Sequence, residues 1–106
     1  MHTYLLAELT AILPLGGHRV RATFADGFTG EVDLAGLIDH GPIFAPLRDV
    51  AYFQTVRAED GAPVWSDDLD LSPGTLRAWC EAGRVLTMPE TDAWIAEHSR
   101  EAQSVA

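Results

Sequence analysis

The sequence predicts an α+β domain: a small, mostly antiparallel sheet of about five strands, one helix packed on it, and a second, C-terminal helix. Two Asp-Gly pairs, Asp26-Gly27 and Asp60-Gly61, each join stretches with strand-like patterns, which is a strong short-range signal of a β-hairpin. Two helix-start signals follow, at Ser72 and Thr87. A chain of 106 residues, 47% hydrophobic and 22% charged, is sufficient for one domain with a real core.

The N-terminal part supplies three predicted strands. Residues 9 to 14 form the first, and Gly16-Gly17 follows as a turn. Residues 18 to 25 alternate apolar and polar side chains, which is the period of a half-buried strand. Residues 28 to 34 return with the same alternation after Asp26-Gly27, so this hairpin is well defined by the sequence.

Glycine and proline interrupt residues 41 to 47, so no long element is expected there. A short helical turn at 48 to 52 and a core position for Phe53 follow. Residues 54 to 59 and 62 to 66 are then the strands of the second Asp-Gly hairpin. The interrupted segment is expected to lay three apolar side chains across the sheet: Ile43, Phe44 and Leu47.

The first predicted helix covers 73 to 82. Ser72 suits its N-cap, Pro73 its first position, and Gly83 a left-handed C-cap. Residues 87 to 90 match a capping box, so a second helix is expected from 88 to about 101. One apolar stripe of the first helix is made by Leu76, Trp79 and Cys80.

Charge and cysteine content restrict the function. Sixteen acidic residues, seven arginines and no lysine give a net charge of −9. Such a surface repels nucleic acid and acidic membranes and favours a basic protein partner, although acidity can also serve solubility alone. A single cysteine excludes an internal disulfide, and no signal peptide or membrane-spanning segment is visible, so a cytoplasmic protein is expected.

The acidic elbow between Trp65 and Ser72 holds Asp67, Asp68 and Asp70 and is one candidate site. A calcium loop needs a longer series of alternating oxygen ligands and a late glutamate, which are absent. The four histidines lack zinc-site spacing, so neither a metal nor a cofactor is expected. The alternative is a solvated loop whose aspartates accept backbone hydrogen bonds before the helix. The histidines are His2, His18, His40 and His98.

No catalytic constellation stands out, and the protein is not expected to be an enzyme. Cys80 falls on the apolar helical stripe, where a thiol is buried and unreactive. Arg19 and Arg21 share one strand face, where pairing with Glu31 and Asp33 across the hairpin is the alternative to a binding role. The arginines considered for nucleic-acid contact are Arg19, Arg21 and Arg57.

The three tryptophans are predicted to differ in role. Trp79 is expected in the core. Trp65 and Val64 face opposite sides of one strand, so a helix or a partner must cover one of them. Trp94 breaks the stripe of the last helix, which makes it a candidate partner anchor, unless it folds back onto the domain. That helix and an uncovered edge strand leave a homodimer open.

An ordered set of segments resembles the bacterial domain-of-unknown-function family 2442 over residues 10 to 82. The resemblance implies an α+β unit with a small antiparallel sheet and a packed helix, and no established enzymatic role. Some family genes stand beside a gene for a second small protein, as in toxin–antitoxin modules, with this family as the antitoxin-like partner. The segments are Val20–Gly27, Val32–Leu34, Ile43–Asp49, Phe53, Val64-Trp65, Asp70-Leu71, Pro73 and Leu76.

Residues 1–83 are therefore expected to form the family domain and residues 84–106 a helical extension. Some relatives carry a helix-turn-helix after the domain, but one helix is too little for that motif. The favoured function is a non-enzymatic protein-binding module, antitoxin-like, whose partner is a small basic protein encoded nearby. The alternative is a small ligand- or metal-binding domain or enzyme that uses the Asp67–Asp70 elbow.

Overall fold

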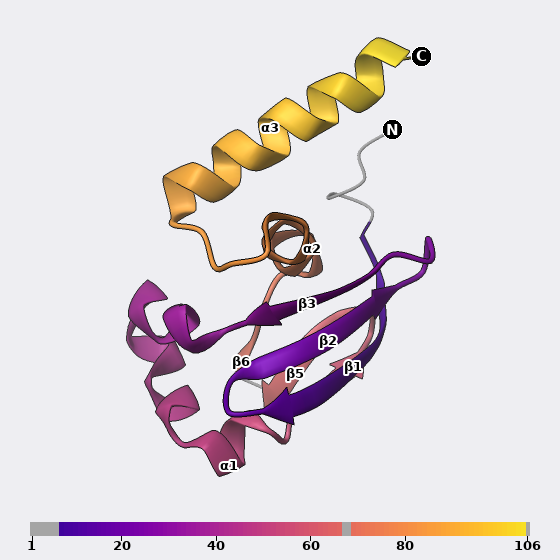
Figure 1. Ribbon diagram of the computed structural model, residues 1–106. Coiled ribbons are helices and arrows are strands. Elements are labelled where there is room, and N and C mark those ends of the chain that lie inside the picture. Colours follow the sequence, from indigo (N-terminus) through magenta and orange to yellow (C-terminus); the bar gives the residue numbers. More distant parts are fainter. Residues whose placement is uncertain (1–6, 67–68, 106) are drawn as a thin grey trace.

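The computed structural model describes residues 7–66 and 69–105, with side chains as far as residue 98. The chain forms two three-stranded antiparallel sheets and several helices, so the α+β class is confirmed (Figure 1). In chain order, the elements are β1 Leu9–Gly16, β2 Arg19–Phe24, β3 Thr29–Asp33, the 3₁₀ helices η1 Ala35–His40 and η2 Pro42–Arg48, α1 Val50–Phe53, β4 Arg57–Glu59, β5 Ala62–Ser66, β6 Leu69–Asp70, α2 Pro73–Ala82 and α3 Met88–Val105.

The first sheet has the order β1-β2-β3. Residues 20, 22 and 24 of β2 are buried, while Arg19 and Arg21 are exposed, as the alternation predicts. Gly27 has a φ of 95°, a conformation that glycine adopts without steric cost. The hairpin predicted at Asp26-Gly27 is therefore confirmed, with Ala22 of β2 opposite Gly30 of β3.

The second sheet has the order β4-β5-β6. Asp60 and Gly61 have φ values of 53° and 81°, the left-handed pair that a tight two-residue hairpin turn requires. After β5 the acidic elbow adds a strand that the sequence does not predict, because Asp70 pairs with Val64. Leu69 of this short strand is buried, and that burial favours strand pairing over an open loop.

A single sheet of about five strands is therefore wrong. The two sheets lie against each other, and the Leu9 amide donates to the Gly61 carbonyl at 2.8 Å, but no ladder joins β1 to β4. The strand expected at 54–59 is shortened to 57–59. Its first residues instead close α1, because the Gln54 and Thr55 amides donate to carbonyls of that helical turn.

Residues 41 to 47, the segment interrupted by glycine and proline, also differ from the prediction at one position. Leu47 and Phe53 are fully buried and Phe44 is partly buried, as predicted. Ile43 does not lie across the sheet, because 58% of its surface is exposed. In the 3₁₀ helix η2, side chains three positions apart lie on the same side. Phe44 and Leu47 therefore share one side of the helix, and Ile43 points in another direction.

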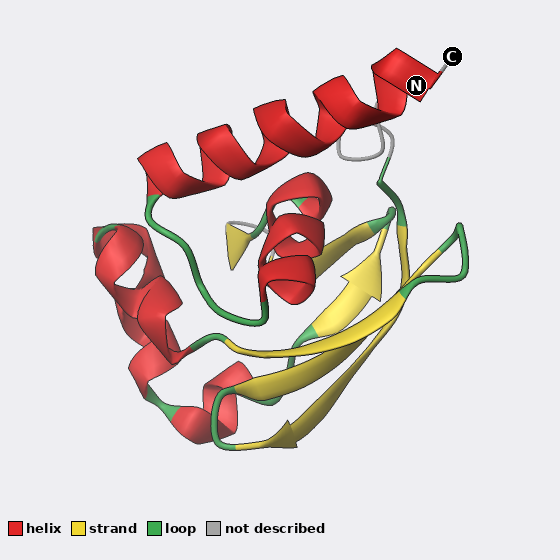
Figure 2. Cartoon of the chain, turned by 45° about the horizontal axis from the view of Figure 1, so that its top comes forward, coloured by secondary structure: helices red, strands yellow, loops and turns green. Residues whose placement is uncertain are grey.

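Helix α2 lies between the sheets and α3, and both views show it enclosed (Figures 1 and 2). The predicted caps are confirmed: Ser72 Oγ accepts from the Thr75 amide, and Gly83 has a φ of 79°. Burial extends beyond the predicted stripe, since Arg77 and Ala78 are buried too. Gly30 of β3 permits this close packing, because a Cβ there would lie 3.0 Å from the Cβ of Cys80.

Helix α3 begins with the predicted capping box. The Thr87 amide donates to Glu90 Oε1 at 2.9 Å, and the Glu90 amide donates to Thr87 Oγ1 at 3.2 Å. The helix continues to Val105, beyond the expected end near 101. The indole N–H of Trp79 donates to Thr91 Oγ1 at 2.9 Å, which ties α3 to the buried helix.

Arg77 connects α2 to the first hairpin. Its guanidinium lies 4.1 Å from the ring centre of Phe28 and donates to both carboxylate oxygens of Asp26 at 3.0 Å. Its Nε donates to Glu81 at 2.7 Å. Desolvation raises the pKa of Asp26, but hydrogen bonds from the Phe28 amide and from Arg77 outweigh it and lower that pKa overall.

We predict that Arg77→Met lowers the free energy of unfolding by about 2 kcal/mol, the scale of hydrogen bonds to charged groups. Arg19→Met is the matched control: Arg19 also pairs with a carboxylate, but its side chain is 54% exposed against 9% for Arg77. Arg19→Met should lower the free energy of unfolding by less than about 1 kcal/mol. Urea unfolding measures both variants. Equal losses for the two variants would contradict the role given to Arg77.

The same variant has a pH signature. Because the pKa of Asp26 is lowered from 3.8, its contribution to stability is complete above pH 3.8 and is lost as the pH falls through the lower, folded-state value. In Arg77→Met that pKa should move upward, and an NMR titration of the Asp26 carboxyl carbon would measure it. No movement would show that the Phe28 amide alone sets the pKa.

Candidate functional site

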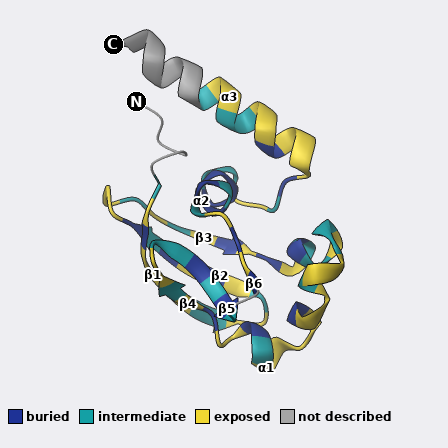
Figure 3. Cartoon of the chain, turned by 180° about the vertical axis from the view of Figure 1, so that it is seen from behind, coloured by how far each residue is buried: buried dark blue, intermediate teal, exposed yellow. Residues whose placement is uncertain are grey.

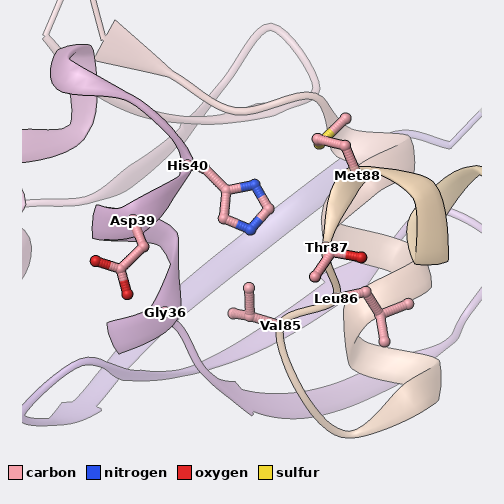
Figure 4. Close-up of a pocket in the computed structure, with 7 residues that line it drawn as sticks. All are labelled: Gly36, Asp39, His40, Val85, Leu86, Thr87 and Met88. Carbon is pink, nitrogen blue, oxygen red and sulfur yellow. The ribbon is translucent and has the colours of Figure 1, made fainter.

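A cavity with polar and apolar walls lies between η1 and the linker that joins α2 to α3 (Figure 4). Its volume is about 450 Å³. The His40 ring projects from η1 toward the linker, where Val85, Thr87 and Met88 stand opposite. The full lining is Gly36, Asp39, His40, Val85, Leu86, Thr87 and Met88.

A second cavity of about 210 Å³ adjoins the first, because His40 and Met88 line both. Its walls are mainly apolar and come from η1, η2, the segment from Leu71 into α2, and the start of α3. The ring centroids of His40 and Trp79 are 5.2 Å apart, so two aromatic rings form one side. We call the two spaces the His40 groove. The second cavity is lined by Leu37, His40, Phe44, Leu71, Thr75, Trp79 and Met88.

The walls of the His40 groove include exposed side chains. Asp39 on its wall is exposed and forms no ion pair with a described residue. Met88, at the start of α3, is 51% exposed. Among the lining residues, no nucleophile is hydrogen-bonded to a base, the arrangement that covalent catalysis requires.

The acidic elbow is described only in part. Asp67 and Asp68 lie outside the described residues, so their proposed site stays a prediction. Asp70 is exposed on β6 and lines a separate pocket of about 280 Å³ with Glu59 and Asp60. Within the part of the chain that the structure describes, no three histidine, cysteine or acidic side chains gather as metal ligands.

Cys80 lies on α2 as predicted, and only 7% of its surface is exposed. Burial desolvates the thiolate and raises the pKa of this thiol to about 12. A thiol is nucleophilic only when ionised, so Cys80 is packing material at neutral pH. The interpretation of this residue as a small buried hydrophobe is confirmed.

Most of the described arginines pair with carboxylates of the same chain. Arg19 and Arg21 both pair with Glu31, at 3.1 and 2.8 Å, while Asp33 accepts the Ala35 amide instead. The hydrogen bond from Arg21 is the main reason that the pKa of Glu31 is lowered. Of the six arginines with described side chains, five pair with carboxylates: Arg19, Arg21, Arg57, Arg77 and Arg84. Arg48 is the sixth.

Many exposed carboxylates, by contrast, have no basic partner among the described side chains. Figure 3 shows that the exposed positions follow the turns, the η1–η2 segment and the outer side of α3, away from the buried α2. Eight exposed carboxylates form no ion pair among the described side chains: Glu8, Asp33, Asp39, Asp49, Asp60, Asp70, Asp92 and Glu97. The unpaired charge of this surface is therefore strongly negative.

The tryptophans are all tied to the domain. Trp79 is fully buried, and Trp65 is buried with its indole N–H donating to the Phe53 carbonyl at 2.9 Å. Trp94 is partly buried; its N–H donates to Glu81 Oε1 at 3.2 Å, and its ring stacks on His98 at 4.2 Å. These contacts describe a side chain that folds back, and a role for Trp94 in partner binding stays a prediction.

Comparison with known proteins gives a family. A model for a protein of unknown function, DUF2442, matches residues 9–82. The chain belongs to this family. A crystal structure of a candidate DNA-binding protein from Nitrosomonas europaea is similar to this DUF2442 chain, with a TM-score of 0.63 and 30% sequence identity. The match covers 73% of this chain and 50% of that protein, so the DUF2442 chain spans half its length. No curated protein matches the sequence.

No helix in the described ranges is long and apolar enough to cross a membrane.

The His40 groove is not predicted from the sequence, because its walls come from four separate segments and no spacing rule links them. Its one local signal is a histidine that directly follows the apolar pair Leu37-Ile38 and Asp39.

We predict that Cys80 resists Ellman's reagent in the folded protein. With a pKa of about 12, roughly one molecule in ten thousand carries a thiolate at pH 8, since each pH unit is a factor of ten. The reaction should proceed only after guanidinium unfolds the chain, and absorbance of the released thiolate measures it. Rapid labelling of the native protein would contradict the burial of this thiol.

Proposed function

We propose that this DUF2442 chain is a non-enzymatic protein-binding module that takes a basic protein partner. The observation that carries the proposal is the imbalance in ion pairing. Five of six described arginines are bound to carboxylates of the same chain, whereas eight exposed carboxylates have no basic partner among the described side chains.

Electrostatics explains why such a surface selects a basic protein. The net charge of −9 accelerates and orients the approach of a positively charged partner, and it opposes association with acidic ones. Because the unpaired carboxylates are exposed, forming new ion pairs with a partner breaks none of the internal pairs that hold the fold.

The antitoxin-like role is the finer part of the proposal. It rests on the family resemblance, because some genes of the family stand beside a gene for a second small protein. An acidic module that masks a basic protein has the charge that such a role requires. The partner proposed is therefore the product of the adjacent gene.

Direct DNA binding is the second candidate, favoured by the similarity to the Nitrosomonas europaea protein. Phosphate contacts need cationic side chains that are free to release counterions. Arg19, Arg21 and Arg57 are paired with carboxylates, which opposes this candidate. It is kept because the match covers only 50% of the comparison protein, so its DNA-binding part need not be the part shared here.

We expect the tagged full chain, co-expressed with the adjacent gene product, to retain it at about 150 mM salt and to release most of it at about 500 mM, where charges are screened beyond a few ångströms. Size-exclusion chromatography of the eluted complex is the measurement. Failure to co-purify at the lower salt would count against the protein-binding function.

A charge-reduced variant supplies the control. Glu8→Gln, Asp92→Asn and Glu97→Gln together remove exposed charges that take part in no ion pair, so folding should be retained and partner affinity lowered. A labelled DNA duplex tests the second candidate by fluorescence anisotropy. Duplex binding that survives physiological salt would favour the DNA candidate over the protein partner.

A further inference from the structure

We propose that the His40 groove is the binding site for the basic partner and receives one arginine or lysine side chain from it. This inference rests on the protein-binding function proposed above and names the place and the chemistry of the contact. Three properties of the groove carry it: its size, its aromatic wall and its unpaired carboxylate.

The inner cavity has room for one long side chain. Its volume of about 210 Å³ is roughly seven times the ~30 Å³ that a water molecule occupies in the liquid. Phe44 gives the cavity a partly exposed apolar wall, which suits the aliphatic stem of arginine or lysine, because that stem packs readily on apolar surface. The half-exposed Met88 is flexible and can close over such a stem.

The aromatic wall suits the cationic end. A cation within about 6 Å of the face of an aromatic ring is attracted by that ring, and guanidinium groups make this contact more often than ammonium groups. The protein already binds one guanidinium in this way: Arg77 lies on Phe28 and Phe24, with the carboxylates of Asp26 and Glu81 at its edge. Trp79 itself is fully buried, so the aromatic surface that the groove offers comes from the partly exposed rings of Phe44 and His40, and Asp39 adds a carboxylate on the wall of the adjoining cavity.

No cation of the protein fills this place among the described residues. No arginine lines either part of the groove, and Arg84 of the adjoining linker pairs with Glu90 at 3.6 Å. Asp39 therefore remains available for a charge brought by another chain. Because the whole protein carries −9, a basic side chain is drawn to this carboxylate and an acidic one is repelled.

The probe is a blocked peptide, Gly-Ser-Leu-Arg-Leu-Ser-Gly, with a second peptide in which neutral citrulline replaces arginine. Both are titrated into the ¹⁵N-labelled full chain to about 5 mM, several times a ~1 mM dissociation constant. The arginine peptide should shift the indole N–H of Trp79 and the amides of Gly36, Asp39 and Met88. The citrulline peptide should bind about fivefold more weakly, or show no binding.

Matched variants separate the groove from general acidity. Asp39→Asn should weaken the arginine peptide by up to about fivefold, the range of an exposed ion pair, and Asp60→Asn should leave its affinity unchanged. Met88→Ala should weaken both peptides, and Leu13→Ala neither, although the two parent side chains are exposed to similar extents, 51% and 53%.

The inference is overturned if no shifts appear, if they cluster outside the groove, if citrulline binds as well as arginine, or if Asp39→Asn and Asp60→Asn have equal effects. These outcomes are separable from failure of the proposed function. A partner that co-purifies with wild type and equally with Asp39→Asn and Met88→Ala would sink the groove alone. Absence of any partner, with peptide shifts in the groove, would sink the protein-binding function alone.

Discussion

Enclosure of α2 is the constraint on which the rest of this structure depends. Residues 76 to 80 are all buried, so every polar group among them needs a partner within the protein. The Trp79 indole finds Thr91 of α3, and the Arg77 guanidinium finds Asp26 of the first hairpin and Glu81 of its own helix. No buried polar side-chain atom among the described residues lacks a hydrogen-bond partner. The polar groups of one short helix thus tie both α3 and the first hairpin to it.

The same arrangement explains where the candidate site lies. Trp79 uses its indole N–H on α3, while its ring extends to His40 of η1. The linker that carries the chain from α2 to α3 passes opposite η1, and the space left between them is the His40 groove (Figure 4). The groove is therefore held by the core itself, and its shape does not depend on a long mobile loop.

The distribution of charge links stability to function. Arginines in this chain stabilise local pairs, from the exposed cluster with Glu31 to the buried position of Arg77. Carboxylates exceed them, and the excess lies on the surface. Binding a basic partner there would add ion pairs and remove none, which is why the proposed association is compatible with the fold as it stands.

Local features of this protein were determined by the sequence alone. Both Asp-Gly turns, the caps of α2, the capping box of α3 and the burial of Trp79 follow from rules that act within a few residues, and each is present. The net charge and the inert position of Cys80 were also predictable. These rules depend on backbone angles and on neighbours three or four positions away.

Only the tertiary structure decided the rest. The division into two sheets, the strand at Leu69–Asp70 and the exposure of Ile43 depend on which segments meet in space. Arg77 and Asp26 are 51 positions apart, and the groove joins four segments, so no periodicity or spacing connects their members. Burial and ion pairing are properties of the folded surface as a whole, and a pattern along the chain cannot assign them.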